Sequence, residues 1–327
     1  MAKAYDVLIR NARVYDGSGG PPAQADVALE NDRIARIGSL DGCSAELEVD
    51  ATKLALSPGF IDVHTHDDFA ALLHPDMGFK SRGGVTTCIV GNCGFGAAPF
   101  AEAVEMLGKL VPSEQITPYQ GYAGYAAALE SNKPGVNIGV LAGHGTIRKA
   151  AVGSVDRTLT DQEMSAMKAL LQEALDAGVF GISSGLIYDP GRYAGTDELV
   201  ELVSVMRGTG GLYVTHMRNE GSGLLDSVSE AIEIGARGGV GVQISHHKAR
   251  GRESWGLVED SVKLIEEAQR RGEDVHADQY PYTAGSTSLQ TVLENGAFAE
   301  ESQFGEMRML PPDDVVIASA LGHPEWE

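Results

Sequence analysis

Two histidines one residue apart stand at the end of a short apolar run. The stretch Ser57–Asp68 reads Ser-Pro-Gly-Phe-Ile-Asp-Val-His-Thr-His-Asp-Asp, so these histidines are His64 and His66. Residues two apart in a β-strand project from the same face, so both imidazoles are expected to point the same way. Imidazole is a common zinc ligand, and two convergent imidazoles would supply half of a tetrahedral site. The stretch therefore predicts metal binding, with a surface pair of histidines as the alternative.

Other metal-binding residue types recur downstream, each at or after the end of an apolar run. Cys93 lies in Gly-Asn-Cys-Gly-Phe-Gly, whose glycines suggest a backbone bent to aim the thiol. His216 and His246 close two further runs. Cys93 could instead be a small buried hydrophobic residue, and His216 could pair with Glu220. Packing alone does not explain why such residues recur at the ends of several runs, so we expect one shared metal site.

Two more histidines have an open role. His247 follows His246 directly and would point to the opposite face if the strand continued, so we expect only His246 to face the site. His144 also stands at the end of an apolar run, and its predicted role is divided between hydrogen bonding to the site and a structural contact.

Strand-like apolar runs alternate with helical stretches after residue 56. This alternation predicts parallel strands joined by crossover helices. The metal-type residues stand at the carboxyl ends of several different runs, where (β/α)₈ barrels carry their chemistry. A TIM-type α/β barrel is therefore favoured over an open doubly wound sheet. The expected strands are Phe60–Val63, Val85–Val90, Val136–Leu141, Val179–Ile182, Leu212–Thr215, Val240–Ile244 and Asp274–Ala277.

The clearest helix is predicted over Thr160–Ala177. Thr160 and Glu163 have the spacing of a capping box, and Gly178 is placed to end the helix. Its apolar face consists of Met164, Met167, Leu171 and Ala174. Similar faces are expected in Thr196–Arg207, with Leu199, Leu202, Val203 and Met206, and in Val258–Arg271, with Val258, Val262 and Ile265.

The first 56 residues have a different pattern, with short alternating runs separated by turns at Asp16-Gly17 and Asn31-Asp32. We expect a small β domain over residues 1–56, followed by the barrel over residues 57–327. Its expected strands are Val7–Asn11, Ala25–Leu29, Ile34–Ile37 and Leu54–Leu56.

Composition excludes several classes of function. The 327-residue chain has a formal net charge of −21, which argues against nucleic acid or an anionic membrane surface as partner. Three cysteines are too few for a disulfide framework, and Cys88 lies inside a predicted strand as a core residue. Since there is no signal-like apolar segment and no long apolar run, we expect a cytoplasmic protein that does not span a membrane.

Taken together, these motifs resemble the amidohydrolase superfamily, and within it the N-acyl-D-amino-acid deacylases (D-aminoacylases). Besides Ser57–Asp68, the matching stretches are Gly-Asn-Cys-Gly-Phe-Gly, Ser-Ser-Gly-Leu-Ile-Tyr-Asp-Pro-Gly, Thr-His-Met-Arg-Asn-Glu, Ile-Ser-His-His-Lys and Tyr-Pro-Tyr-Thr-Ala-Gly-Ser-Thr. The first motif marks only the superfamily. The cysteine is more specific, because many relatives use a carboxylated lysine as bridging ligand.

The resemblance implies zinc-dependent hydrolysis of the amide bond of N-acyl-D-amino acids, with L-enantiomers largely untouched. The implied ligands of a tightly bound zinc ion are Cys93, His216 and His246. The implied ligands of a second, weaker metal position are His64 and His66. The implied substrate-binding residues are Lys248, Tyr188 and Tyr280, one tyrosine being an alternative group for polarising the scissile carbonyl.

The catalytic residue of the family is an aspartate at the end of strand eight, and the sequence contains no match to it. The tail after Tyr282, residues 283–327 with a strand-like run at Val315–Ser319, resembles an insert before that strand, so we expect a truncated family member lacking strand eight. Asp278 is expected to hydrogen-bond near the metal rather than to act as the catalytic acid. An open barrel would expose strand edges, so we expect poor stability or self-association and activity near background.

Two other functions remain open. A cyclic-amide hydrolase of the dihydroorotase or hydantoinase type would keep the fold, although Cys93 in place of a bridging lysine argues against it. A metal-binding remnant without turnover would follow from the missing aspartate.

Overall fold

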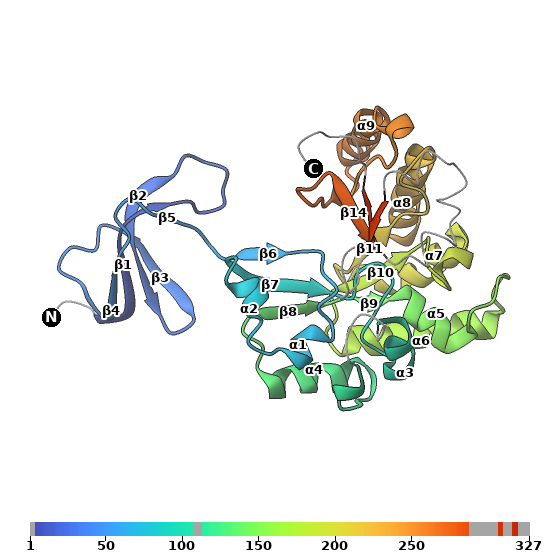
Figure 1. The fold of residues 1–327 in the computed structure, drawn as a ribbon, viewed down its shortest axis with the longest axis horizontal. Coiled ribbons are helices and arrows are strands. Elements are labelled where there is room, and N and C mark those ends of the chain that lie inside the picture. Colours follow the sequence, from blue (N-terminus) through green and yellow to red (C-terminus); the bar gives the residue numbers. More distant parts are fainter. Residues whose placement is uncertain (1–3, 108–112, 288–306, 310–315, 320–327) are drawn as a thin grey trace. The chain divides into compact units, whose positions relative to one another are not determined.

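The computed structural model describes residues 4–107, 113–287, 307–309 and 316–319. Its internal contacts divide the chain into two units, Met1–Phe60 and Ile61–Glu327 (Figure 1).

The first unit is a β-sheet in the order β3-β2-β1-β4, with β5 also paired to β1. β1 pairs antiparallel with β2 but parallel with β4 and β5. All four predicted strands are present, and β4 is an additional one. Ala45, Leu47 and Val49 alternate with acidic residues, so the sequence carried the period-two signal of a strand and the prediction overlooked it. The strands are β1 Ala4–Val14, β2 Ala23–Glu30, β3 Arg33–Gly38, β4 Ser44–Asp50 and β5 Ala55–Leu56.

The barrel strands of the second unit follow one another in chain order, as β6-β7-β8 and β9-β10-β11-β12-β13. β8 and β9 are separated only by Leu141. β7 pairs parallel with β8, and each strand from β9 to β12 pairs parallel with the next one in the chain. All seven predicted runs are strands, which confirms the predicted α/β TIM-type architecture. They are β6 Phe60–Asp62, β7 Val85–Val90, β8 Asn137–Val140, β9 Ala142–Gly143, β10 Gly181–Gly185, β11 Leu212–His216, β12 Gly241–Ile244 and β13 Val275–Ala277.

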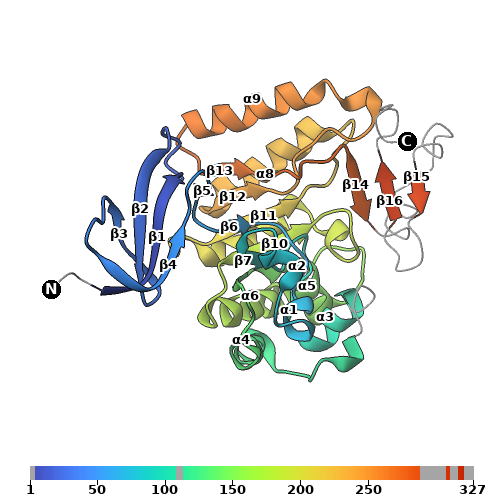
Figure 2. The same cartoon turned by 60° about the vertical axis from the view of Figure 1, so that its left-hand side comes forward.

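Helices connect these strands, and α5 to α9 lie outside them (Figures 1 and 2). The α-helices are α1 Ala70–Leu73, α2 Gly78–Ser81, α3 Phe100–Leu107, α4 Gly121–Asn132, α5 His144–Val152, α6 Asp161–Asp176, α7 Thr196–Val203, α8 Leu224–Gly238 and α9 Leu257–Arg270. Short 3₁₀ helices are η1 Ser113–Gln115, η2 Gly191–Tyr193, η3 Ser204–Met206 and η4 Arg252–Ser254. A separate antiparallel sheet contains β14 Ala284–Thr287, β16 Val316–Ser319 and β15 Met307–Met309, in that spatial order.

Helix α6 has the predicted start and buried face. The Thr160 hydroxyl accepts from the N–H of Glu163, and the Glu163 carboxylate accepts from the N–H of Thr160. Its four predicted apolar residues are all buried. The face predicted for α9 was partly wrong, because Ile265 is buried as predicted but Val262 is 41% exposed, and Ser261 and Ala268 belong to the buried face. Residues at i, i+4 and i+7 form one stripe, and Val262 lies about 100° away from Ser261.

In the part of the chain that the structure describes, no helix combines the length and apolar character needed to cross a membrane.

Candidate metal centre

The Cys93 thiol lies between two imidazoles. Its Sγ is 3.3 Å from Nε2 of His64 and 3.6 Å from Nε2 of His246. Zinc bonds of about 2.3 Å to sulfur and about 2.0 Å to nitrogen, at a tetrahedral angle, would put two such donors about 3.5 Å apart. The spacing of these donors therefore fits a zinc ion.

Glycines allow the Cys93 loop to approach neighbouring strands closely. A side chain at Gly91 would overlap the Leu141 carbonyl, and one at Gly185 would overlap the Cys93 carbonyl. Cys93 itself has a φ of 55°, in the left-handed region that non-glycine residues rarely adopt. The local backbone is thus fixed by packing in a conformation that turns the thiol toward the histidines.

His246 lies in a turn after the end of β12, with a φ of 36°. The strand ends at Ile244 as predicted, so the two-residue alternation expected for a continuing strand does not apply to His246 and His247. His246 lies in the cluster, whereas Nε2 of His247 lies 2.9 Å from Oγ of Ser261 on α9.

His216 closes β11, and its ring centroid is 4.4 Å from that of His246. Its Nδ1 is 3.4 Å from the hydroxyl of Tyr188, while its Nε2 is buried without a hydrogen-bond partner among the described residues. Burial lowers the pKa of His216 well below the usual range, with the neighbouring His246 as the next cause. A neutral imidazole with a buried, unpartnered nitrogen is suited to bind a metal ion.

His66 differs from the other candidate ligands. β6 ends at Asp62, so the expected strand alternation between His64 and His66 was wrong. Their rings are 5.7 Å apart, and His66 is exposed. Among the described residues, the groups of three donors within 4.8 Å of one another do not include His66. These groups are His64, Cys93 and His246, and His216, Glu220 and His246.

Two carboxylates lie behind the histidines. Asp278 is 3.3 Å from Nδ1 of His64, and it accepts hydrogen bonds from the His246 N–H at 2.7 Å and the Gln243 amide at 3.0 Å. Glu220 is 2.8 Å from Nδ1 of His246. Burial alone would raise the pKa of both acids, but these neighbours lower both below their usual values. Both groups therefore present negative charge to the histidines.

The predicted substrate-binding residues lie beside this cluster. The Lys248 ammonium is 2.6 Å from Glu220 and 5.5 Å from the centre of the Tyr280 ring. The Tyr188 hydroxyl contacts His216. Sequence reasoning considered Glu220 only as a partner of His216. Its carboxylate lies within 4.8 Å of the ligand atom of His216, but its direct contacts are to His246 and Lys248. The sequence did hint at Glu220, because it lies only four residues after His216 in the same loop.

Burial also sets the charge state of the thiol. It raises the pKa of Cys93 well above the usual value, and the negative charges of Glu220 and Asp278 raise it further. The side chain is thus a thiol until a cation compensates for the loss of its proton.

His144 lies elsewhere, in a buried ion-pair cluster. Its Nε2 is 3.1 Å from Glu198, which also accepts a 3.0 Å hydrogen bond from Arg148. The Arg148 side chain is completely buried. These contacts connect α5 to α7 and give His144 a structural partner.

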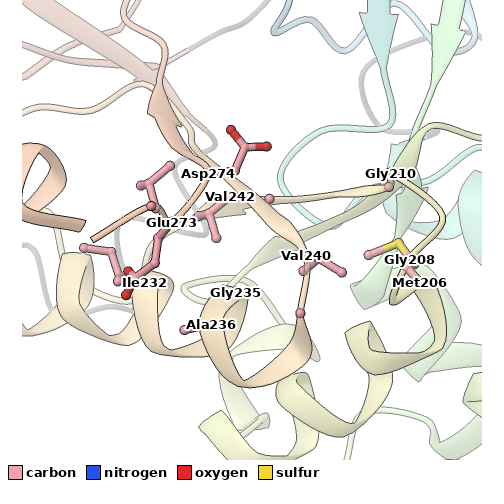
Figure 3. A pocket seen from close by; sticks show the side chains of 15 residues that line it. Met206, Gly208, Gly210, Ile232, Gly235, Ala236, Val240, Val242, Glu273 and Asp274 are labelled. Carbon is pink, nitrogen blue, oxygen red and sulfur yellow. The ribbon is translucent and has the colours of Figure 1, made fainter. Parts of the chain in front are cut away.

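A pocket of about 420 Å³ lies at the opposite ends of β11, β12 and β13 from His216 and His246 (Figure 3). Residues that precede these strands line it, including Gly210, Val240 and Asp274. It is therefore separate from the candidate metal centre.

Known proteins resemble the chain in sequence and structure. The D-aminoacylase of Alcaligenes xylosoxydans xylosoxydans is 39% identical over 290 residues, covering 88% of this chain and 60% of that protein. The N-acyl-D-aspartate deacylase of the same organism is 38% identical over 288 residues, covering 87% and 57%. The chain thus spans less than two thirds of the length of these relatives.

Solved structures of proteins with the same kinds of name also resemble the chain. The N-acyl-D-glutamate deacylase of Bordetella bronchiseptica, complexed with zinc and a phosphonate inhibitor, has a TM-score of 0.83 at 34% identity, covering 94% of this chain and 63% of that one. A structure concerned with the binuclear metal center of D-aminoacylase has a TM-score of 0.80 at 38% identity, covering 87% and 60%. L-hydantoinase from Arthrobacter aurescens, at 19% identity and a TM-score of 0.56 over 85% of this chain and 58% of that one, shares the fold alone. The amidohydrolase family (Amidohydro_3) matches residues 47–300, and the chain belongs to this family.

Proposed function

We propose that this protein hydrolyses the amide bond of N-acyl-D-amino acids in a zinc-dependent reaction that yields a carboxylate and a D-amino acid. The observation that carries the proposal is the Cys93–His246 donor pair at 3.6 Å beside the buried Nε2 of His216, which has no partner in the described part of the chain. The relatives described above, which are 34–39% identical, are named for this class of substrate.

Cys93, His216 and His246 would hold the zinc ion, with His64 and His66 at a second, weaker position. The spacing around Cys93 supports His64 and His246, the ring contact with His246 supports His216, and donor type alone supports His66. A bound zinc ion polarises the acyl carbonyl and lowers the pKa of a water molecule to about 7. The chain's own contribution is to keep the imidazoles of His216 and His246 neutral, because burial lowers the pKa of both, and to hold the thiol beside them.

Lys248, Tyr188 and Tyr280 would position the substrate. An N-acyl amino acid carries a carboxylate, and a charge-assisted hydrogen bond from the Lys248 ammonium would orient it. Burial raises the pKa of Tyr280 to about 12 and that of Tyr188 still further, so both hydroxyls keep their protons as donors. The alternative role of one tyrosine is to donate to the scissile carbonyl.

Amide hydrolysis also needs a group that moves a proton to the leaving nitrogen. Asp278 lies next to the cluster, where its carboxylate accepts from His246 and Gln243 and lies 3.3 Å from Nδ1 of His64, so its contacts include residues that carry the ligands. We therefore assign Asp278 to hydrogen bonding with the ligand loop rather than to proton transfer.

The test uses protein produced from the complete reading frame that encodes this sequence. Release of amine from N-acetyl-D- and N-acetyl-L-amino acids would be compared after zinc removal and after zinc restoration. We expect zinc-dependent turnover of the D-series and little of the L-series. Turnover of hydantoin or dihydroorotate alone would favour the cyclic-amide alternative, and zinc binding without turnover of any of these amides would favour the non-catalytic one.

The division into residues 1–56 and 57–327 and the tendency to self-associate stay predictions. We also propose a cytoplasmic location, which the three free cysteines support, because disulfides are typical of oxidising compartments.

A further inference from the structure

One carboxylate oxygen contacts both a candidate ligand and the candidate substrate-binding lysine. Oε1 of Glu220 is 2.8 Å from Nδ1 of His246 and 2.6 Å from Nζ of Lys248. The Glu220 side chain is only 8% exposed, so solvent screens these contacts weakly. The proposed function gives Glu220 no role.

The neighbours of Nδ1 of His246 oppose each other. Nζ of Lys248 lies 3.1 Å from this nitrogen, and an ammonium group can only donate. The ionised carboxylate of Glu220 can only accept. Glu220 therefore favours the tautomer with its proton on Nδ1, whereas Lys248 favours the tautomer with its proton on Nε2.

These two tautomers differ in whether His246 can act as a ligand. Nε2 is the nitrogen that faces Sγ of Cys93, at 3.6 Å, and it offers a lone pair there only when the proton is on Nδ1. We propose that Glu220 is a positioning residue that keeps this proton on Nδ1 of His246 and retains the Lys248 ammonium so that it does not donate to that nitrogen. The inference rests on the proposed function only in assigning Nε2 to a metal ion.

The test measures zinc affinity by competition with a chromophoric chelator. Glu220→Gln has nearly the same shape, loses the charge and can turn its own N–H toward Nδ1. We expect zinc affinity to fall about 10- to 100-fold, the usual effect of losing such a partner. Adding Lys248→Met to Glu220→Gln should recover part of that loss, because the rival donor is removed. Glu230→Gln, which alters the carboxylate paired with Arg218, is the control and should leave zinc affinity unchanged.

A folded Glu220→Gln protein with unchanged zinc affinity, or a double variant that binds no better than Glu220→Gln, would overturn the proposal. If Glu220→Gln does not fold, ¹⁵N spectra of the histidine-labelled, zinc-free wild-type protein decide instead. Signals assigned through His246→Gln should show a protonated Nδ1, and a protonated Nε2 would refute the assignment. Neither readout uses turnover, so absence of deacylation would count against the proposed function and leave this inference standing.

Discussion

Cys93 and His246 both have left-handed backbone conformations, with φ of 55° and 36°. Each such conformation costs a non-glycine residue about 1 kcal/mol or more, and it persists only where surrounding contacts impose it. For Cys93, the close approach of its carbonyl to Gly185 is one such contact. Strain at two residues whose side chains meet supports a shared functional role for them.

Replacing Cys93 by Ala should remove most of the bound zinc, because the thiolate is the only sulfur donor among the described residues of the cluster. Zinc per chain would be measured by elemental analysis after dialysis. Cys88→Ala is the matched control, since Cys88 is also buried but packs in a separate apolar cluster. Equal zinc content in the Cys93→Ala protein would show that the ligand assignment is wrong.

Asp278→Asn separates two roles for this side chain. An amide keeps one of the two acceptor oxygens, which can still accept from the His246 N–H, while the Gln243 contact is lost or reversed. We therefore expect turnover of the protein from the complete reading frame to change by less than about tenfold. A proton-transferring carboxylate would instead be worth about 10²- to 10⁴-fold. The measurement is kcat for an N-acetyl-D-amino acid at saturating zinc, and a loss in the larger range would make Asp278 catalytic.

At the scale of elements, sequence patterns located the strands and the first turn of α6, because alternation and capping are local properties. These patterns did not predict the backbone conformation of the loops that follow the strands. His64, Cys93 and His246 all lie beyond strand ends, where tertiary packing sets the backbone. The contact of Glu220 with Lys248 joins two such loops across 28 positions. Period-two reasoning could therefore not find it.

The capping box of α6 predicts a pH-dependent contribution to stability. Hydrogen bonds from Arg157, then from the N–H and hydroxyl of Thr160, lower the pKa of Glu163 from 4.5 to about 2. Since the folded pKa is depressed, this contribution is present above pH 4.5 and is lost as the pH falls toward 2. Glu163→Gln should therefore lower Tm at neutral pH, and its difference from wild type should shrink as the pH falls below 4.5.

The control is Glu266→Gln, which changes an exposed glutamate on α9. Thermal unfolding followed by circular dichroism at several pH values would measure both variants. A Tm difference for Glu163→Gln that stays constant across the acid range would argue against a depressed pKa.

At the scale of the molecule, the cluster of His144, Arg148 and Glu198 joins helices α5 and α7. Removing one partner of a buried ion pair leaves the other charge uncompensated, at a cost of about 3–5 kcal/mol. Glu198→Ala should lower the free energy of unfolding by roughly this amount. Zinc per folded chain should stay unchanged, because among the described residues the side-chain partners of this cluster do not include a candidate metal ligand.

Urea unfolding at fixed pH would measure the effect. Glu201→Ala is the comparison on the same helix, because Glu201 pairs with Lys168 at the surface. Such pairs contribute about 0–1 kcal/mol. Equal destabilisation by the two variants would show that burial of the cluster does not matter.

The Cys93–His246 contact joins positions 153 residues apart, whereas Cys93 and His64 are 29 apart. Contacts between residues far apart in the sequence form late and make folding slower. The entropy cost of closing the long loop arises before the contact can stabilise the structure. During refolding, Cys93 and His64 can meet once β6 and β7 are in place, but His246 joins them only after β12 has been added. The protein should therefore reach its final zinc affinity only in a late folding phase. Free zinc should raise the stability of the folded state more than it raises the rates of the early folding steps.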